Sequence, residues 1–136
     1  MDQQASPTAS PPVAPAAPIQ EEVAAASMAP VEGFFAYDVR VGTVVAARAN
    51  AGARVPALVL TIDFGELGRR VTSAQLTRRY APEALVGRQV VAVVNFPPKR
   101  IAGVRSEVLV LGGVPEKGDV VLLAPDTGVP NGTRIG

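Results

Sequence analysis

The stretch Asn95-Phe-Pro-Pro-Lys-Arg-Ile-Ala-Gly-Val-Arg-Ser-Glu-Val-Leu-Val-Leu-Gly112 decides which kind of fold this 136-residue chain adopts. It begins where a run of valines ends, and its two prolines prevent that strand from continuing. Three cations (Lys99, Arg100 and Arg105) surround a glycine before a second apolar run begins. The pattern predicts a rigid basic loop at the end of a small β-sheet.

Short strand-like runs lie on both sides of this loop. They cover residues 39–47, 57–64, 69–73, 89–95, 107–111 and 120–124, and turn residues separate them. Pro82–Leu85 is suited to one short helix that Gly87 can end, and Gly42 lies at a position suited to a bulge or a barrel bend. This order predicts an all-β protein with one short helix, a five-stranded Greek-key OB-fold barrel. From the pattern alone, other small barrels remain open.

The composition changes near residue 30. Residues 1–30 hold six of the thirteen prolines, much alanine and no aromatic residue. Such a segment buries too little apolar surface to offset its ordering entropy, so we predict a disordered low-complexity tail over 1–30 and a domain over 31–136. Met28 lies at the change, and we hypothesise that translation begins there. An intact mass of the native protein that starts at Met1 would exclude this.

Several function classes are excluded by missing residue types. The chain has no cysteine and no histidine, so disulfides, Cys/His metal sites and histidine-dependent catalysis are excluded. No spacing of carboxylates, lysine or serine suggests another catalytic site. We therefore expect a protein that is not an enzyme and has no cofactor or metal. No stretch is long enough to span a membrane and no signal peptide is recognisable, so we expect a cytoplasmic protein.

The charge is unevenly distributed along the chain. Residues 1–33 carry four acids and no base, whereas the remainder carries thirteen bases, eleven of them arginine, and eight acids. Arginine binds phosphate in a planar, two-pronged geometry. A solvated surface and a polyanionic partner both explain such a surplus, and the charge alone does not separate them.

Five separate segments then resemble one family, the tRNA-binding OB-fold domain. They are 38–42 (Asp-Val-Arg-Val-Gly), 62–65 with 73–76, the stretch 93–107 with its Asn, Pro-Lys-Arg and Gly-Val-Arg-Ser-Glu, 118–119, and 129–132. Within the family, Ser-Ala-Gln, Val-Val-Asn-Phe-Pro-Pro and Ser-Glu-Val-Leu-Val-Leu-Gly resemble the CsaA branch of export-related chaperones. The same domain occurs at the C-terminus of methionyl-tRNA synthetases. The resemblance implies a homodimer of barrels that binds structured tRNA and, for the CsaA branch, unfolded or export-bound polypeptides.

Ten residues are candidates for ligand binding. Asn95 can cap its own turn, but the family match favours a groove residue. Lys99, Arg100 and Arg105 form either a solvated rim or a phosphate clamp, and we favour the clamp. Glu107 either holds Arg40 or Arg105 in register or contacts a ligand. The set is Arg40, Gln75, Arg78, Arg79, Asn95, Lys99, Arg100, Arg105, Ser106 and Glu107.

For some of these residues a role other than ligand binding fits the sequence equally well. Gln75 lies where OB folds present ligands, but it can also satisfy a loop backbone. Arg78 and Arg79 beside Tyr80 suit either a polar helix face or nucleic acid.

The chain also departs from the family pattern near the expected groove. Ala102 stands where many relatives carry a cation, Val108 stands where they have glycine, and 56–60 lacks an expected lysine. Each change removes charge or adds bulk, which favours weaker RNA binding. We therefore predict a tRNA-binding protein that assists protein export, and keep as the alternative a polypeptide-binding chaperone with little functional RNA binding.

Overall fold

The computed structural model of the chain describes residues 27–136. The tail predicted over residues 1–30 lies outside this part except for its last four positions. In chain order the elements are the 3-10 helix η3 (Val31–Ala36), β1 (Val39–Ala49), β2 (Leu58–Asp63), the 3-10 helix η4 (Gly65–Leu67), β3 (Arg69–Ala74), α2 (Pro82–Leu85), β4 (Gln89–Val93), β5 (Lys99–Ile101), β6 (Val104–Ser106), β7 (Leu109–Val110), β8 (Gly112–Glu116) and β9 (Asp119–Leu122). Phe35–Gly136 form one compact unit, and the interactions described below lie within it.

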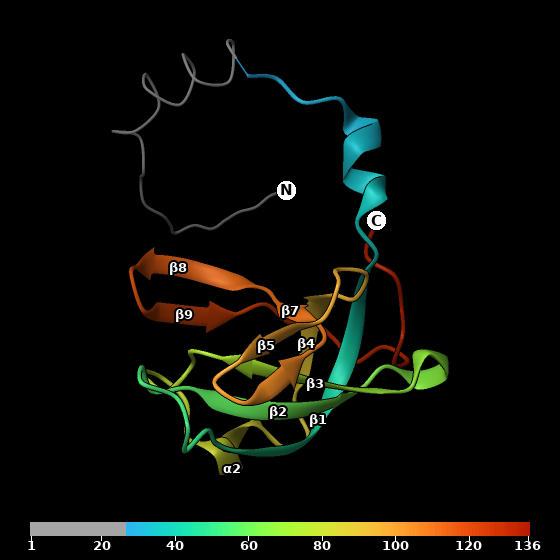
Figure 1. The fold of residues 1–136 in the computed structure, drawn as a ribbon. Coiled ribbons are helices and arrows are strands. Elements are labelled where there is room, and N and C mark those ends of the chain that lie inside the picture. The colour runs from blue at the N-terminus through green and yellow to red at the C-terminus, as the bar shows by residue number, and fades with distance from the viewer. Residues whose placement is uncertain (1–26) are drawn as a thin grey trace, which may run out of the picture. The chain divides into compact units, whose positions relative to one another are not determined.

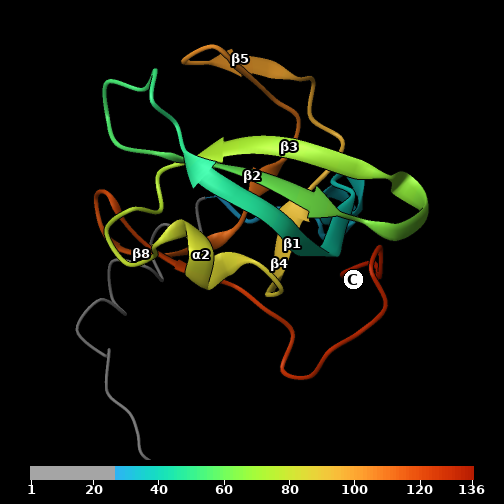
Figure 2. The same cartoon turned by 90° about the horizontal axis from the view of Figure 1, so that it is seen from below.

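Five strands form an antiparallel sheet in the order β3-β2-β1-β4-β7, which curls into a nearly closed barrel (Figures 1 and 2). The first half of β1 pairs with β4 and its second half pairs with β2. Between Val44 and Ala46 the register of β1 on β2 shifts, and such a bulge bends a strand and increases its twist. The bend lets β1 pair with β4 through its first half and with β2 through its second half. The predicted all-β barrel with one short helix is confirmed.

Side chains complete the barrel where β3 meets the segment between β6 and β7. The Glu107 backbone N–H donates to the Val71 carbonyl at 2.8 Å, and the Val71 N–H donates to the Glu107 carboxylate at 2.9 Å. The Thr72 hydroxyl donates to the Val108 carbonyl at 2.8 Å and lies 2.9 Å from the Ser106 hydroxyl. The strand predicted over 107–111 therefore forms only at Leu109–Val110 as β7, because the chain passes here from the β3 side of the barrel to the β4 side.

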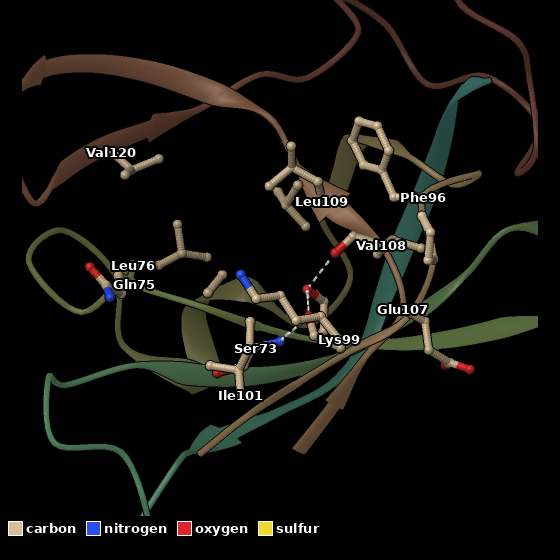
Figure 3. A pocket seen from close by; sticks show the side chains of 15 residues that line it. Ser73, Gln75, Leu76, Phe96, Lys99, Ile101, Glu107, Val108, Leu109 and Val120 are labelled. Atoms are coloured by element: carbon tan, nitrogen blue, oxygen red, sulfur yellow. Dashed lines mark hydrogen bonds between the residues drawn. The ribbon is translucent and has the colours of Figure 1, made fainter. Parts of the chain in front are cut away.

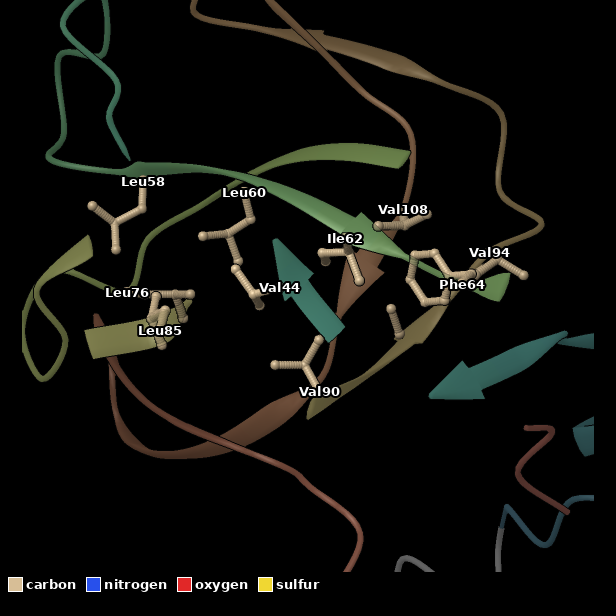
Figure 4. Packing of buried hydrophobic residues seen from close by; sticks show 11 residues of the cluster. Val44, Leu58, Leu60, Ile62, Phe64, Leu76, Leu85, Val90, Val94 and Val108 are labelled. Atoms are coloured by element: carbon tan, nitrogen blue, oxygen red, sulfur yellow. The ribbon is translucent and has the colours of Figure 1, made fainter. Parts of the chain in front are cut away.

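Aliphatic side chains and one phenylalanine fill the barrel (Figure 4). Leu58, Leu60 and Ile62 alternate along β2 and are fully buried, as the period of a strand requires. Leu85 ends α2 and is buried beside Leu76 at one end of the cluster (Figure 4). Burying one such side chain stabilises the fold by about 1.5–3 kcal/mol.

A second, smaller apolar cluster lies on the other face of β1 and β4. Val39, Val41, Val91 and Val93 are buried there, and three partly buried side chains, Leu111, Val129 and Ile135, cover them. The valine run of β4 is therefore buried on both faces, as predicted. Val129 and Ile135, near the C-terminus, thus pack against this chain's own strands.

Gly42 is required by packing, whereas the sequence suggested a bulge or a bend at this position. A Cβ on Gly42 would lie 2.6 Å from Ile62 Cγ2 and 2.8 Å from the Phe64 ring. The bulge itself lies two residues later, at Val44–Ala46. At Gly87, which follows α2, φ is +93°, so this predicted helix end is confirmed.

Candidate functional site

The basic stretch predicted as a loop forms the hairpin of β5 and β6. Its register pairs Lys99 with Ser106, Arg100 with Arg105 and Ile101 with Val104. The two turn residues, Ala102 and Gly103, both have positive φ, of 49° and 83°. This is the backbone of a two-residue hairpin turn, and it matches the right-handed twist of the strands.

Arg100 and Arg105 are direct cross-strand partners on an exposed surface. Like charges placed opposite one another destabilise a strand pair by about 0.2–1 kcal/mol. Partial compensation comes from the Gly103 carbonyl, which accepts a hydrogen bond from Arg100 Nη1 at 3.1 Å, and from the Glu107 carboxylate, 3.8 Å from Arg105. The Arg105 side chain remains 65% exposed. An anion placed over the pair would relieve the repulsion.

A groove of about 520 Å³ lies beneath this hairpin, between β3 and the segment 106–110. Most of its surface is apolar: Leu76, Phe96, Ile101, Leu109 and Val120 line it (Figure 3). The exposed fractions of Phe96, Ile101 and Leu109 are 39%, 38% and 51%. Phe96 is held by an edge-to-face contact with Tyr37, at 5.8 Å between ring centroids.

Four of the predicted residues line the groove: Gln75, Lys99, Ser106 and Glu107. The Lys99 side chain extends toward Leu76, whereas the Glu107 carboxylate points away from Lys99 (Figure 3). Ser106 is buried, and its hydroxyl accepts a hydrogen bond from the Ser73 N–H at 3.2 Å. Gln75 is exposed and has no hydrogen-bonding partner among residues 27–136. Lys99 and Gln75 are therefore the freely available polar groups of the groove.

Glu107 performs a structural task that the sequence did not indicate. One carboxylate oxygen accepts the Val71 N–H, as described above, and the other lies near Arg105. Arg40, the other suggested partner of Glu107, pairs instead with Asp38. The Arg40–Asp38 ion pair has a 2.5 Å N–O distance, and Arg40 also donates to the Gly132 carbonyl at 3.0 Å. The hydrogen bond between Arg40 and Asp38 lowers the pKa of Asp38 and raises the pKa of Arg40.

Asn95 lies outside the groove and does not cap its own turn. Its side-chain oxygen accepts the Asp38 N–H at 2.9 Å, and its side-chain amide donates to the Ala36 carbonyl at 2.9 Å. Both hydrogen-bonding ends of the amide are therefore occupied. The residue joins the end of β4 to the segment that leads into β1, a partner 57 residues away that no local motif identifies.

Arg78 and Arg79 hold the hairpin of β8 and β9. Arg78 pairs with Glu116 at 2.5 Å, and Arg79 makes two hydrogen bonds to the Asp119 carboxylate, one of them 2.9 Å long. The hydrogen bond from Arg79 lowers the pKa of Asp119. The Tyr80 hydroxyl accepts the Leu122 N–H at 3.0 Å. Arg78 and Arg79 lie in a turn and not on a helix face, and a contact of theirs with nucleic acid stays a prediction.

The sequence prediction missed the apolar lining of the groove. Along 106–109 Ser106 and Val108 are buried and Leu109 is exposed, but the sequence Ser-Glu-Val-Leu does not alternate between polar and apolar residues and so gave no signal of this. Among residues 27–136 no group of three or more acidic residues is arranged to hold a metal ion. No helix in the same range has the length and apolar character needed to cross a membrane.

Comparison with known proteins gives a consistent result. The family described as "Putative tRNA binding domain" matches residues 39–134. The crystal structure of the chaperone CsaA from Bacillus anthracis str. Ames is 63% identical in sequence with a TM-score of 0.78, and the match covers 81% of this chain and 100% of that one. The CsaA chaperone protein of Picrophilus torridus is 41% identical with a TM-score of 0.73, over 80% of this chain and 100% of that one.

Curated synthetases also contain a similar segment. The methionine–tRNA ligase of Methanothrix thermoacetophila is 43% identical over 115 residues, which is 85% of this chain and 17% of the ligase. That of Porphyromonas gingivalis (strain W83) is 35% identical over 124 residues, 88% of this chain and 16% of the ligase. The chain thus spans about one sixth of the length of these relatives.

Proposed function

Because this chain belongs to the tRNA-binding domain family and is of the CsaA type, we propose that it binds tRNA through the β5–β6 hairpin without catalysing a reaction. The resemblance predicted from the five sequence segments is confirmed at the level of the family. The synthetase relatives match over a small part of their length, so their aminoacylation activity is not extended to this chain.

The Arg100–Arg105 pair carries the proposal. Two arginines are opposed on a stiff hairpin, and only one of them has a carboxylate nearby, at 3.8 Å. Phosphates of an RNA backbone supply the missing negative charge in the two-pronged geometry that arginine prefers. Pro97 and Pro98 precede the hairpin and limit the entropy lost on binding. Lys99 adds a third cation on the groove side of the same hairpin.

The contacts that the other candidate residues already make within the chain decide whether we propose them as ligand contacts or as supports of the site. Gln75 remains a proposed contact at the far side of the groove. Ser106 and Glu107 contribute by keeping the hairpin on the barrel. Four residues are occupied within the chain and are proposed as supports of the site, not as its contacts: Arg40, Arg78, Arg79 and Asn95.

The test is the salt dependence of tRNA binding. With three phosphates neutralised, affinity should fall roughly fortyfold between 50 and 200 mM salt. Replacing Lys99 and Arg105 by alanine should reduce the slope of log K against log salt by about 1.8, because two contacts are lost. Filter binding or fluorescence anisotropy measures both. Lys117→Ala in the β8–β9 turn is the matched control and should bind like the wild type. A wild-type affinity that does not change with salt would contradict the proposal.

A second function is favoured by the groove. Its lining is mostly apolar and has few polar groups. An extended polypeptide can lie along it with its apolar side chains against Leu76, Phe96 and Leu109. We propose that unfolded or export-bound polypeptides bind there in the cytoplasm. Two relatives of known structure are described as chaperones.

A homodimer is the proposed assembly. Phe35, Tyr37 and Leu123 are each between 47% and 54% exposed on the unit 35–136, and a second copy can cover apolar surface of this kind. Light scattering that gave a monomeric mass would contradict the assembly.

A further inference from the structure

The loop between β1 and β2, residues 50–57, is held in a defined conformation by its first residue. Asn50 is buried, and its side-chain oxygen accepts the Gly52 N–H at 3.1 Å. Its backbone N–H donates to the Ala57 carbonyl at 2.9 Å, and its carbonyl accepts the Ala53 N–H at 3.2 Å. Its amide also reaches the Ser73 hydroxyl on β3 at 3.4 Å. The loop is thus closed at its base and joined to the barrel.

This loop touches the tip of the basic hairpin. A Cβ built on Gly52 would lie 3.1 Å from the Ala102 carbonyl oxygen, so the two turns approach backbone to backbone. Figure 2 shows the loop and the hairpin at the same end of the barrel. The contact is made at a strained position, because Ala102 has a φ of 49°, a left-handed conformation that places the alanine Cβ close to a neighbouring carbonyl oxygen. Glycine at position 52 leaves room for the strained turn.

Arg54 lies two residues beyond this contact. Its side chain is exposed and has no ion-pair partner among residues 27–136, and the loop contains no acidic residue. Pro56 stiffens the segment that follows. The cation is therefore presented to solvent by a fixed loop that contacts the hairpin of Lys99, Arg100 and Arg105.

We propose that the β1–β2 loop and the β5–β6 hairpin form one phosphate-binding surface, in which Arg54 is the fourth cation. The proposal rests on tRNA being the ligand, as proposed above, and adds a residue outside the ten that the sequence indicated. A backbone phosphate next to those bound by Arg100 and Arg105 would be the partner of Arg54. The Gly52–Ala102 contact keeps the two loops in register.

Arg54→Ala tests the surface directly. At 0.1 M salt it should weaken tRNA binding roughly fivefold to tenfold and lower the salt slope by about 0.9, which is the effect of one lost phosphate contact. Arg69→Ala is the matched control: Arg69 is exposed, carries the same charge and lies at the other end of β2 and β3. It should bind like the wild type. Equal losses in the two variants would overturn the proposal, because a general charge effect would then explain both.

Gly52→Ala tests the contact between the loops. The added methyl group forces the hairpin tip away by a few tenths of an ångström, so tRNA affinity should fall while the unfolding midpoint stays close to that of the wild type. Gly128→Ala, whose added Cβ would meet nothing closer than 3.9 Å, should bind normally. If wild-type protein binds tRNA and both Arg54→Ala and Gly52→Ala bind equally well, the inference is wrong and the proposed function stands. If wild-type protein binds no tRNA, both are wrong.

Discussion

Ala102 is the one non-glycine residue with positive φ within residues 27–136, and it stands at the tip of the β5–β6 hairpin. Asparagine adopts this conformation more readily than alanine. We expect Ala102→Asn to raise the free energy of unfolding by about 0.5–1 kcal/mol, as measured by urea denaturation. Gly103→Ala should have the opposite effect, because φ is 83° there. An unchanged or lower stability of Ala102→Asn would show that the turn is not strained.

Single residues were predictable where their role is local. Gly103 is identified by the turn in which it lies, and its positive φ follows from that turn. Gly42 was identified by its position within a strand, but the reason for it is the Ile62 and Phe64 side chains that approach it. Asn95 bonds to Ala36 and Asp38 across the chain, and no short-range pattern reports such partners. The sequence thus identified which residues matter, but it did not identify the residues that they contact.

At the scale of elements, the closure of the barrel depends on hydroxyl groups between β3 and β6. Ser106 is buried, and its hydroxyl contacts both the Thr72 hydroxyl and the Ser73 N–H. Ser106→Ala leaves the Ser73 N–H without this acceptor, so we expect a loss of about 1–3 kcal/mol in the free energy of unfolding. Urea denaturation measures the loss, and amide hydrogen exchange at Ser73 should be faster. Thr133→Ala is a control, since its exposed hydroxyl bonds only to the Pro130 carbonyl. Equal stability in both variants would exclude a closing role for Ser106.

The order of the elements was predictable because proline and glycine residues mark where several of them begin or end. Pro82 begins α2, Gly87 ends the turn that follows it, and Gly118 forms the turn between β8 and β9. The division of 107–111 was not predictable, since a run of Glu, Val and Leu fits either side of a barrel equally well. The chain changes partner at Glu107 because its carboxylate replaces a backbone acceptor for Val71.

At the scale of the whole molecule, the family segments led to the barrel, whereas the charge surplus was compatible with a polyanionic ligand but did not require one. The position of the proposed site was only partly predictable. Lys99, Arg100 and Arg105 are adjacent in the chain and stay together on the hairpin. The groove draws on residues from 72 to 120, and the loop that carries Arg54 meets the hairpin where Gly52 approaches Ala102, 50 residues further along the chain. Surfaces of this kind arise from the fold and are not visible in any one segment.

The groove and the basic hairpin share Lys99, so the two proposed ligands need the same side chain. If a polypeptide fills the groove, it lies directly under the hairpin and excludes RNA from Lys99. We therefore expect tRNA and an unfolded polypeptide to compete for the purified protein. Leu109→Ser should weaken polypeptide binding by removing an exposed apolar contact and leave tRNA binding intact, whereas Arg105→Ala should do the reverse. Val114 is also an exposed apolar residue but lies outside the groove, so Val114→Ser is the control for Leu109→Ser. Simultaneous, independent binding of both ligands would place the polypeptide elsewhere on the molecule.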